Sequence, residues 1–225
     1  MRLLNKARVV RQNHFNNFRS TFEIARQAGF SITLHCGEWM YIFLGIISIE
    51  EDQFTLLRVI IGELPCDEQE SSLTDAYDEV KAILDFHPER LGHALLLPPT
   101  LQKELLERKI PVESCPTSNV MTLELAKHHA GSLLEGLKTH PQLASWIREH
   151  HPFSIGTDDP GVFNTNGTKE LLLLQKALDL DFTQIFEIPL KSMDHAFCNV
   201  EIRKLVKNRL VERIETLSKG MVRIR

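Results

Sequence analysis

Four short motifs bring together the residue types that hold metal ions and move protons. In chain order they read His35-Cys36-Gly37-Glu38, Arg90-Leu91-Gly92-His93, Cys115-Pro116-Thr117-Ser118-Asn119 and Thr157-Asp158-Asp159-Pro160. A neutral imidazole is the commonest metal ligand in proteins. Two adjacent carboxylates are costly to hold together unless a cation or a hydrogen-bond donor offsets their charge. The motifs therefore indicate a site where a metal ion and proton-transferring groups act together.

Each motif also has a purely structural interpretation. His35 could mark an ordinary strand end, and His93 could be a buried histidine with one hydrogen bond. The hydroxyl and amide groups of residues 117–119 could cap the next helix. The two aspartates before Pro160 could form a solvated turn. The chemical interpretation depends on all four motifs meeting at one place.

The segments that carry the motifs alternate between strand-like and helical patterns. Strands are expected at 31–35, 90–93, 110–115 and 153–157. A helical pattern follows each of them, which predicts an α/β fold with a parallel sheet and covering helices. In such folds the ligand lies at the carboxyl ends of the strands. All four motifs are expected at that edge of the sheet.

The chain ends in further helical patterns. The last of them covers residues 200–217. Its apolar positions, such as Leu205, Leu210 and Ile214, have the spacing of a helix face that packs into a core. We expect these helices to contribute packing and no other function.

Residues 37–61 interrupt the alternation where a short loop is expected. The segment is apolar and β-branched, and Gly37-Glu38 at its start is repeated as Gly62-Glu63 after its end. Removing its 25 residues would restore a short loop and put Glu63 in the place of Glu38. Our hypothesis is a retained intron or another insertion; the alternative is a genuine inserted hairpin. Sequencing the spliced transcript distinguishes the two.

Composition excludes several classes of protein. The 26 basic and 30 acidic residues give a net charge of −4, which argues against a nucleic-acid-binding protein. The longest apolar run, 40–49, is about half of what a membrane span needs, and no signal peptide is evident. The four cysteines, at positions 36, 66, 115 and 198, form no Cys-x-x-Cys pair. These features predict a reduced cytoplasmic protein without a membrane or nucleic-acid partner.

Taken together and in this order, the motifs resemble the adenosine deaminase family of metal-dependent hydrolases. That family shows His-x-Gly-Glu, Arg-hydrophobic-Gly-His, a Cys-Pro-x-Ser-Asn-like segment and Thr-Asp-Asp-Pro, which here stand at 35–38, 90–93, 115–119 and 157–160. The details are closer to the adenosine deaminase-like branch, whose members act on adenosine-type nucleosides or on N6-methyl-AMP. The resemblance implies a TIM-type (β/α)8 barrel, and a purine nucleoside or nucleotide as the small-molecule partner.

The resemblance also implies roles for individual residues. His35 and Asp158 would be zinc ligands, and zinc lowers the pKa of a bound water towards about 7. His93 would hold and deprotonate that water. Glu38 would donate a proton to the purine N1 as the water adds to C6, after which ammonia or methylamine leaves.

Three further residues complete the implied site. Asp159 would help position the water and hydrogen-bond the purine, and Ser118 and Asn119 would contact the substrate. Glu63 would replace Glu38 as the catalytic acid if residues 37–61 are spliced out.

One family motif is missing from this chain. The family carries two more zinc ligands in a His-x-His motif on its first strand, and no His-x-His occurs here. The 225 residues are also fewer than the roughly 250 of a complete barrel. We therefore expect a single domain, 1–225, that is incomplete at its N-terminus and holds about four βα units and extra C-terminal helices.

An incomplete barrel has two consequences. We expect it to leave two parallel strand edges uncovered. It also leaves two alternatives to a zinc-dependent deaminase open. One is an inactive fragment that acts by binding or dimerising, and the other is a different metal-dependent amidohydrolase. The oligomeric state does not follow from the sequence.

Overall fold

The computed structural model of the protein describes residues 15–36, 44–48, 59–60 and 69–222. Glu38 and Glu63, the two alternative catalytic acids, lie outside these residues. So does most of the 37–61 segment.

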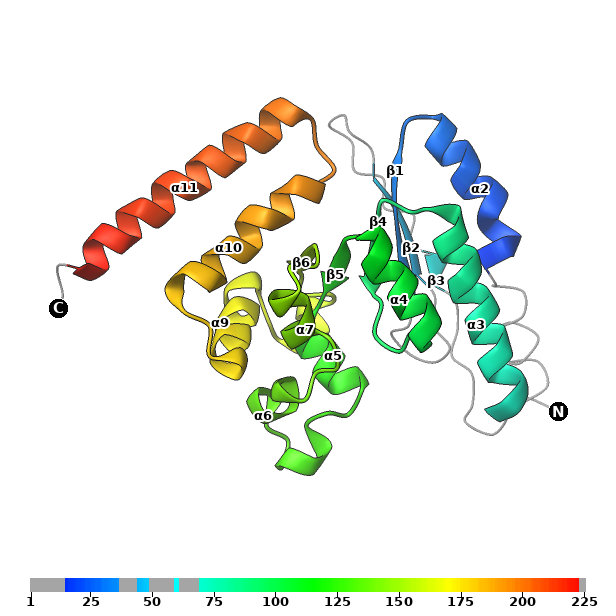
Figure 1. Cartoon of the computed structure of the whole chain (residues 1–225), viewed down its shortest axis with the longest axis horizontal. Helices are drawn as coiled ribbons and strands as arrows, with labels where there is room; N and C mark the ends of the chain where they lie inside the picture. Colours follow the sequence, from blue (N-terminus) through cyan, green and yellow to red (C-terminus); the bar gives the residue numbers. More distant parts are fainter. Residues whose placement is uncertain (1–14, 37–43, 49–58, 61–68, 223–225) are drawn as a thin grey trace.

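A six-stranded sheet with the order β3-β2-β1-β4-β5-β6 forms the centre of the fold (Figure 1). Four of its strands are neighbours and run parallel. They are β1 (Ser31–Cys36), β4 (Arg90–His93), β5 (Val112–Ser114) and β6 (Phe153–Ile155). The predicted strand–helix alternation and parallel sheet are thus confirmed, although β5 and β6 are shorter than expected.

The other two strands come from within the 37–61 segment. β2 (Leu44–Ser48) pairs antiparallel with β1, and β3 (Val59–Ile60) pairs antiparallel with β2. The expectation that both outer parallel strands have an uncovered edge is therefore wrong for β1. The free N–H and C=O groups of that edge pair with the next β-branched run of the chain. The insertion or retained-intron hypothesis stays a prediction.

Helices connect the strands and continue beyond the last one. Before β5 they are α2 (Phe15–Gln27), α3 (Gln69–Phe86) and α4 (Pro99–Arg108). Between β5 and β6 lie α5 (Pro116–Thr122), η1 (Lys127–His129), α6 (Leu133–Lys138) and α7 (Leu143–Arg148). After β6 come α8 (Pro160–Phe163), α9 (Gly167–Leu178), α10 (Phe182–Ser192), η2 (Met193–His195) and α11 (Val200–Val222).

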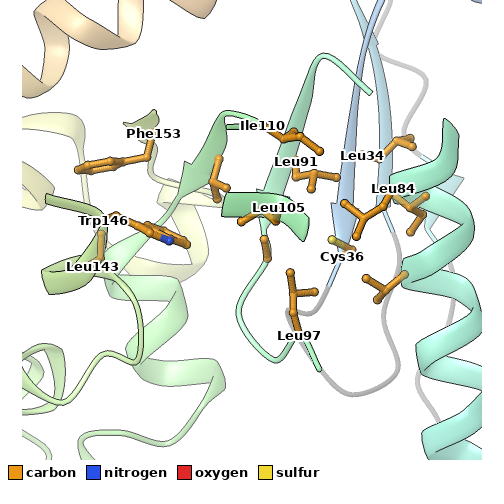
Figure 2. Close-up of a cluster of buried hydrophobic side chains, with 14 of the residues drawn as sticks. Leu34, Cys36, Leu84, Leu91, Leu97, Leu105, Ile110, Leu143, Trp146 and Phe153 are labelled. Atoms are coloured by element: carbon orange, nitrogen blue, oxygen red, sulfur yellow. The ribbon is translucent and has the colours of Figure 1, made fainter. Parts of the chain in front are cut away.

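The hydrophobic core lies between the parallel strands and these helices. Leu34, Leu84 and Leu91 are fully buried on the side of β1 and β4 that α3 covers (Figure 2). Trp146 and Phe153 extend the core towards β6. Every residue of β1 after Ser31 is buried, as expected for a strand that is covered on both faces.

Helix α11 does not fulfil its expected role in the core. It packs against α10 and η2 and extends away from the sheet (Figure 1). Leu205 is 50% exposed, and Leu210 and Ile214 are half-buried. The periodicity is present, but within the described chain this helix has too little partner surface to bury its apolar face. Among the described residues, no helix combines the length and apolar character that crossing a membrane requires.

Candidate active site

His35 is held against the backbone of the neighbouring strand. The residue lies near the carboxyl end of β1, opposite Gly92 of β4. A Cβ atom at Gly92 would come within 2.1 Å of Cδ2 of His35. The glycine of the Arg-Leu-Gly-His motif is thus required sterically, because it leaves the space that the His35 ring fills.

His93 reaches the same place through an unusual backbone. Successive residues of a strand point to opposite faces, so His93 would be directed away from His35. Its φ of 56° takes it out of the extended conformation, and its ring lies 4.9 Å from that of His35, centroid to centroid. His93 is 1% exposed. The left-handed backbone therefore brings together two histidines that the strand pattern would separate.

The aspartate in the turn after β6 completes this group. Asp158, in the turn between β6 and α8, also has a left-handed backbone, with φ of 53°. Its Oδ2 lies 4.0 Å from Nε2 of His93 and accepts a hydrogen bond of 2.8 Å from Oγ of Ser118. The structure thus brings together His35, His93, Asp158 and Ser118 from the ends of β1, β4 and β6 and the start of α5.

Asp159 directly precedes α8. Its backbone carbonyl accepts hydrogen bonds from the N–H groups of Val162 and Phe163, at 3.0 Å each. Its position is fixed by this turn. The roles predicted for its side chain stay predictions.

Asn119 occupies a supporting position behind His93. It is fully buried, and its Oδ1 lies 2.9 Å from Nδ1 of His93. The other end of its amide lies 3.1 Å from Nε2 of His140 and 3.4 Å from Oγ of Ser114. The contact with substrate that the resemblance implies stays a prediction, whereas the contact with His93 was not foreseen.

A half-buried carboxylate that the sequence analysis did not select supports His35. Glu113 of β5 accepts hydrogen bonds from Thr33 Oγ1 at 3.1 Å and from Arg90 Nε at 2.6 Å. Its other oxygen lies 4.0 Å from Nε2 of His35. The Arg90 guanidinium also stacks on Phe197, 3.5 Å from the ring centroid. Strand alternation places Thr33, His35 and Glu113 on one face once the strand register is known.

A second unforeseen carboxylate holds the turn after β5. Glu170 of α9 is 0% exposed. It accepts hydrogen bonds from the backbone N–H of Thr117 at 2.9 Å and from Oγ1 of Thr165 at 2.5 Å. The available signal was a charged residue at the start of an apolar helical pattern. Its buried charge ties the Cys-Pro-Thr-Ser-Asn turn to the segment after Asp158.

The buried thiols around the site are protonated at neutral pH. Burial raises the pKa of Cys36 to about 12, with a smaller contribution from the charge of Glu79. Burial also raises the pKa of Cys115, and the charge of Asp158 adds to the shift. Because the thiolate is the form that attacks or binds a metal, neither cysteine is a candidate nucleophile. Both are free.

The described residues include two of the donor types that zinc prefers. His35 and Asp158 offer the imidazole nitrogen and carboxylate oxygen that zinc prefers. Within the described ranges, however, no three His, Cys, Asp or Glu side chains form a group that could hold a metal ion. Catalytic zinc usually has three protein ligands. The two donors therefore fit a zinc site in type but not in number.

The fold and this arrangement define a class of protein: a parallel α/β protein with acid–base side chains gathered at the carboxyl ends of its strands. A model of the adenosine deaminase family matches residues 74–216, more than half of the chain. The chain belongs to the adenosine deaminase family.

Several relatives match most of the chain. The chain is 28% identical over 174 residues to N6-mAMP deaminase of Arabidopsis thaliana. The aligned region is 76% of this chain and 42% of that protein. It is 27% identical over 197 residues to an adenosine deaminase of Clostridium botulinum, and this aligned region is 86% of this chain and 46% of that protein. The chain thus spans less than half the length of these relatives.

Solved structures agree with the fold. The crystal structure of the Arabidopsis N6-mAMP deaminase matches with a TM-score of 0.61 and 25% identity, over 89% of this chain and 46% of that one. An adenine deaminase of Arthrobacter aurescens matches with a TM-score of 0.58 and 18% identity, over 88% and 48%. The sheet is therefore part of an adenosine deaminase-type α/β barrel.

Proposed function

We propose that this chain carries the second half of the active site of a zinc-dependent purine deaminase. The observation that carries the proposal is the meeting of His35, His93 and Asp158 at one edge of the parallel sheet. Membership of the adenosine deaminase family supports it. The reaction is a hydrolysis in which water adds to C6 of the purine and the exocyclic amine leaves.

The residues of this chain have distinct tasks in that reaction. His35 and Asp158 would hold zinc, which when bound supplies a more acidic water. Ser118 donates to Asp158 Oδ2 and so fixes the orientation of that carboxylate. His93 faces the same centre and contacts the attacking water.

Two carboxyl groups remain for the substrate. Asp159 positions the water and hydrogen-bonds the purine. The proton that N1 of the purine gains comes from Glu38, or from Glu63 if residues 37–61 are absent from the mature protein.

The proposed substrate class is a 6-aminopurine nucleoside or nucleotide, with or without an N6-methyl group. Relatives named N6-mAMP deaminase, N6-methyl-AMP deaminase-L and adenosine deaminase support it. A structure of an Arabidopsis relative, 25% identical to this chain, is complexed with GMP, which supports a purine nucleotide as the type of ligand. The product amine is ammonia from adenosine and methylamine from N6-methyl-AMP.

A second candidate function is a catalytically inactive protein that binds a purine or a second chain. It is favoured by the number of metal donors, because His35 and Asp158 are fewer than the three ligands of a typical catalytic zinc site.

One experiment separates the two candidates. The full chain is purified, its zinc content per molecule is measured, and the absorbance change of adenosine and N6-methyl-AMP is followed. Bound zinc with turnover that is lost in Asp158→Asn supports the deaminase. Asp179→Asn is the matched control, because Asp179 is exposed and has the same left-handed backbone, with φ of 50°. A folded chain without zinc and without turnover would refute the deaminase proposal for this chain and favour the second candidate.

A further inference from the structure

His140 is a buried histidine outside the predicted motifs, and its bonding pattern fixes where its proton sits. Its Nδ1 accepts hydrogen bonds from the backbone N–H groups of Gln142 and Leu143, at 3.2 Å each. An imidazole nitrogen that accepts hydrogen bonds carries no proton. Burial lowers the pKa of His140 to about 4, so the ring is neutral at pH 7. The single ring proton of His140 therefore lies on Nε2.

That proton determines the orientation of the Asn119 amide. Nε2 of His140 lies 3.1 Å from one end of the amide, and Nδ1 of His93 lies 2.9 Å from the other. The oxygen and nitrogen of an amide are interchangeable in shape, so their placement follows from the donors and acceptors around them. An amide nitrogen facing Nε2 of His140 would set two donors against each other. The stable arrangement turns the amide oxygen towards His140 and the amide nitrogen towards His93, which exchanges the two amide atoms relative to the placement with Oδ1 beside His93 Nδ1.

Ser114 agrees with this orientation. Its hydroxyl is fully buried and lies 3.4 Å from the same end of the amide as His140. A hydroxyl can donate to an oxygen as readily as it can accept from a nitrogen. The amide oxygen of Asn119 thus receives the His140 Nε2–H and can receive the Ser114 O–H as well.

We propose that Asn119 and His140 are positioning residues that fix the tautomer of His93. With its oxygen towards His140, the amide of Asn119 points an N–H group at Nδ1 of His93. Nδ1 then accepts, and a neutral His93 carries its proton on Nε2, the atom that lies 4.0 Å from Asp158 Oδ2. The chain of contacts runs from the backbone at the start of α7 through His140 and Asn119 to His93.

The tautomer gives His93 a definite task, and this consequence rests on the proposed function. An imidazole with a proton on Nε2 donates a hydrogen bond to an oxygen at the centre of the site. It holds the attacking oxygen and stabilises negative charge on it. It does not take a proton from that oxygen, because the nitrogen that faces it is already protonated. The proton that the water loses on adding to C6 then passes to the carboxylate of Asp159, which the proposed function places beside that water. The role of base that the resemblance implies for His93 is thereby replaced by that of a donor.

Nuclear magnetic resonance tests the tautomer directly. The full chain is labelled with ¹⁵N at histidine and prepared without metal, and long-range ¹H–¹⁵N correlations report which ring nitrogen is protonated. The His93 signals are identified as those absent from His93→Gln. We expect a protonated Nε2 and an unprotonated Nδ1 for both His93 and His140. A protonated Nδ1 on neutral His93 in the unmodified chain would overturn the proposal, whatever the variants do.

Two variants show whether the contacts act as proposed. Asn119→Asp replaces the amide by a carboxylate, which can only accept, so the His93 proton moves to Nδ1. His140→Leu frees the amide to rotate, and His93 becomes a mixture of tautomers. His128→Leu, at an exposed histidine, leaves the His93 signals unchanged. Unchanged His93 signals in folded Asn119→Asp would show that these contacts contribute to packing and do not set the tautomer of His93.

The outcome is independent of turnover. The tautomer is read from the metal-free chain, so a chain that proves inactive can still confirm the network. An active enzyme whose His93 carries its proton on Nδ1 would refute the network and leave the deaminase proposal standing.

Discussion

The strand-end site and helix α11 differ in how well each side chain matches its surroundings. At the site, polar side chains are buried or half-buried and have hydrogen-bond partners, as Glu113 has in Arg90 and Thr33. In α11, apolar side chains recur at helical spacing but stay exposed, as Leu205 does. A buried polar group without a hydrogen-bond partner costs free energy. The neighbours of each site residue therefore restrict which side chain can stand there. An apolar helix face carries no such requirement and can remain without a partner.

The largest expected difference between the two regions lies in unfolding free energy. Leu91→Ala, in the fully buried part of β4 next to the site, should cost about 2–5 kcal/mol because it removes packed methyl groups and leaves a cavity. Leu205→Ala should change the unfolding free energy by less than about 0.5 kcal/mol. Urea denaturation of both variants measures the difference. Equal losses would mean that α11 is buried by a partner in solution.

A smaller effect is expected from adding a methyl group beside His35. Gly92→Ala would put Cβ within 2.1 Å of the His35 ring, so the ring or the strand must move, at about 1–3 kcal/mol. Gly161→Ala is the matched control, because no heavy atom lies within 4 Å of its added Cβ. Both can be compared by thermal or urea unfolding. If Gly92→Ala unfolds like Gly161→Ala, the close contact between β1 and β4 is not required.

The smallest of the three effects is a loss of stability in mild acid. Burial lowers the pKa of His140 from 6.5 to about 4, so the unfolded chain binds this proton more readily than the folded one. The contribution to stability is complete above about pH 6.5 and is lost as the pH falls towards 4. Between pH 7 and pH 5 the loss should be about 1–2 kcal/mol.

The contribution of His140 can be isolated by comparing variants. The fall in unfolding free energy between pH 7 and pH 5 should be smaller in His140→Gln and unchanged in His128→Leu. His151, which burial also shifts to a pKa of about 4, continues to contribute in both variants. An equal fall in His140→Gln and in the unmodified chain would show that His140 is accessible to protons in the folded state.

Much of the fold followed from local pattern. Strand–helix alternation predicted the parallel order of β1, β4, β5 and β6, because apolar runs bounded by polar turns have few alternatives. The prediction that α11 packs into the core was wrong, because periodicity shows which face of a helix is apolar but not whether another element covers that face. The antiparallel pairing of β2 with β1 was not foreseen as part of the sheet, because strand pairing depends on contacts distant in sequence.

The candidate site was also predictable in part. The motifs identified His35, His93 and Asp158 because histidine and aspartate at strand ends are chemically conspicuous. Glu113, Glu170 and His140 were missed, although each is bonded to a motif residue or to its backbone. They lie in unremarkable sequence, and their importance comes from burial and from the direction of their hydrogen bonds.

By itself the sequence determined the family, the parallel sheet and the chemical types gathered at one edge of it. These depend on residue identity and spacing, which act locally along the chain. The tertiary structure alone decided that His93 turns back towards His35, that Gly92 leaves room for the ring, and that Asn119 is held between two imidazoles. Such features arise where segments far apart in sequence come into contact, because there each donor must meet an acceptor and each atom needs space.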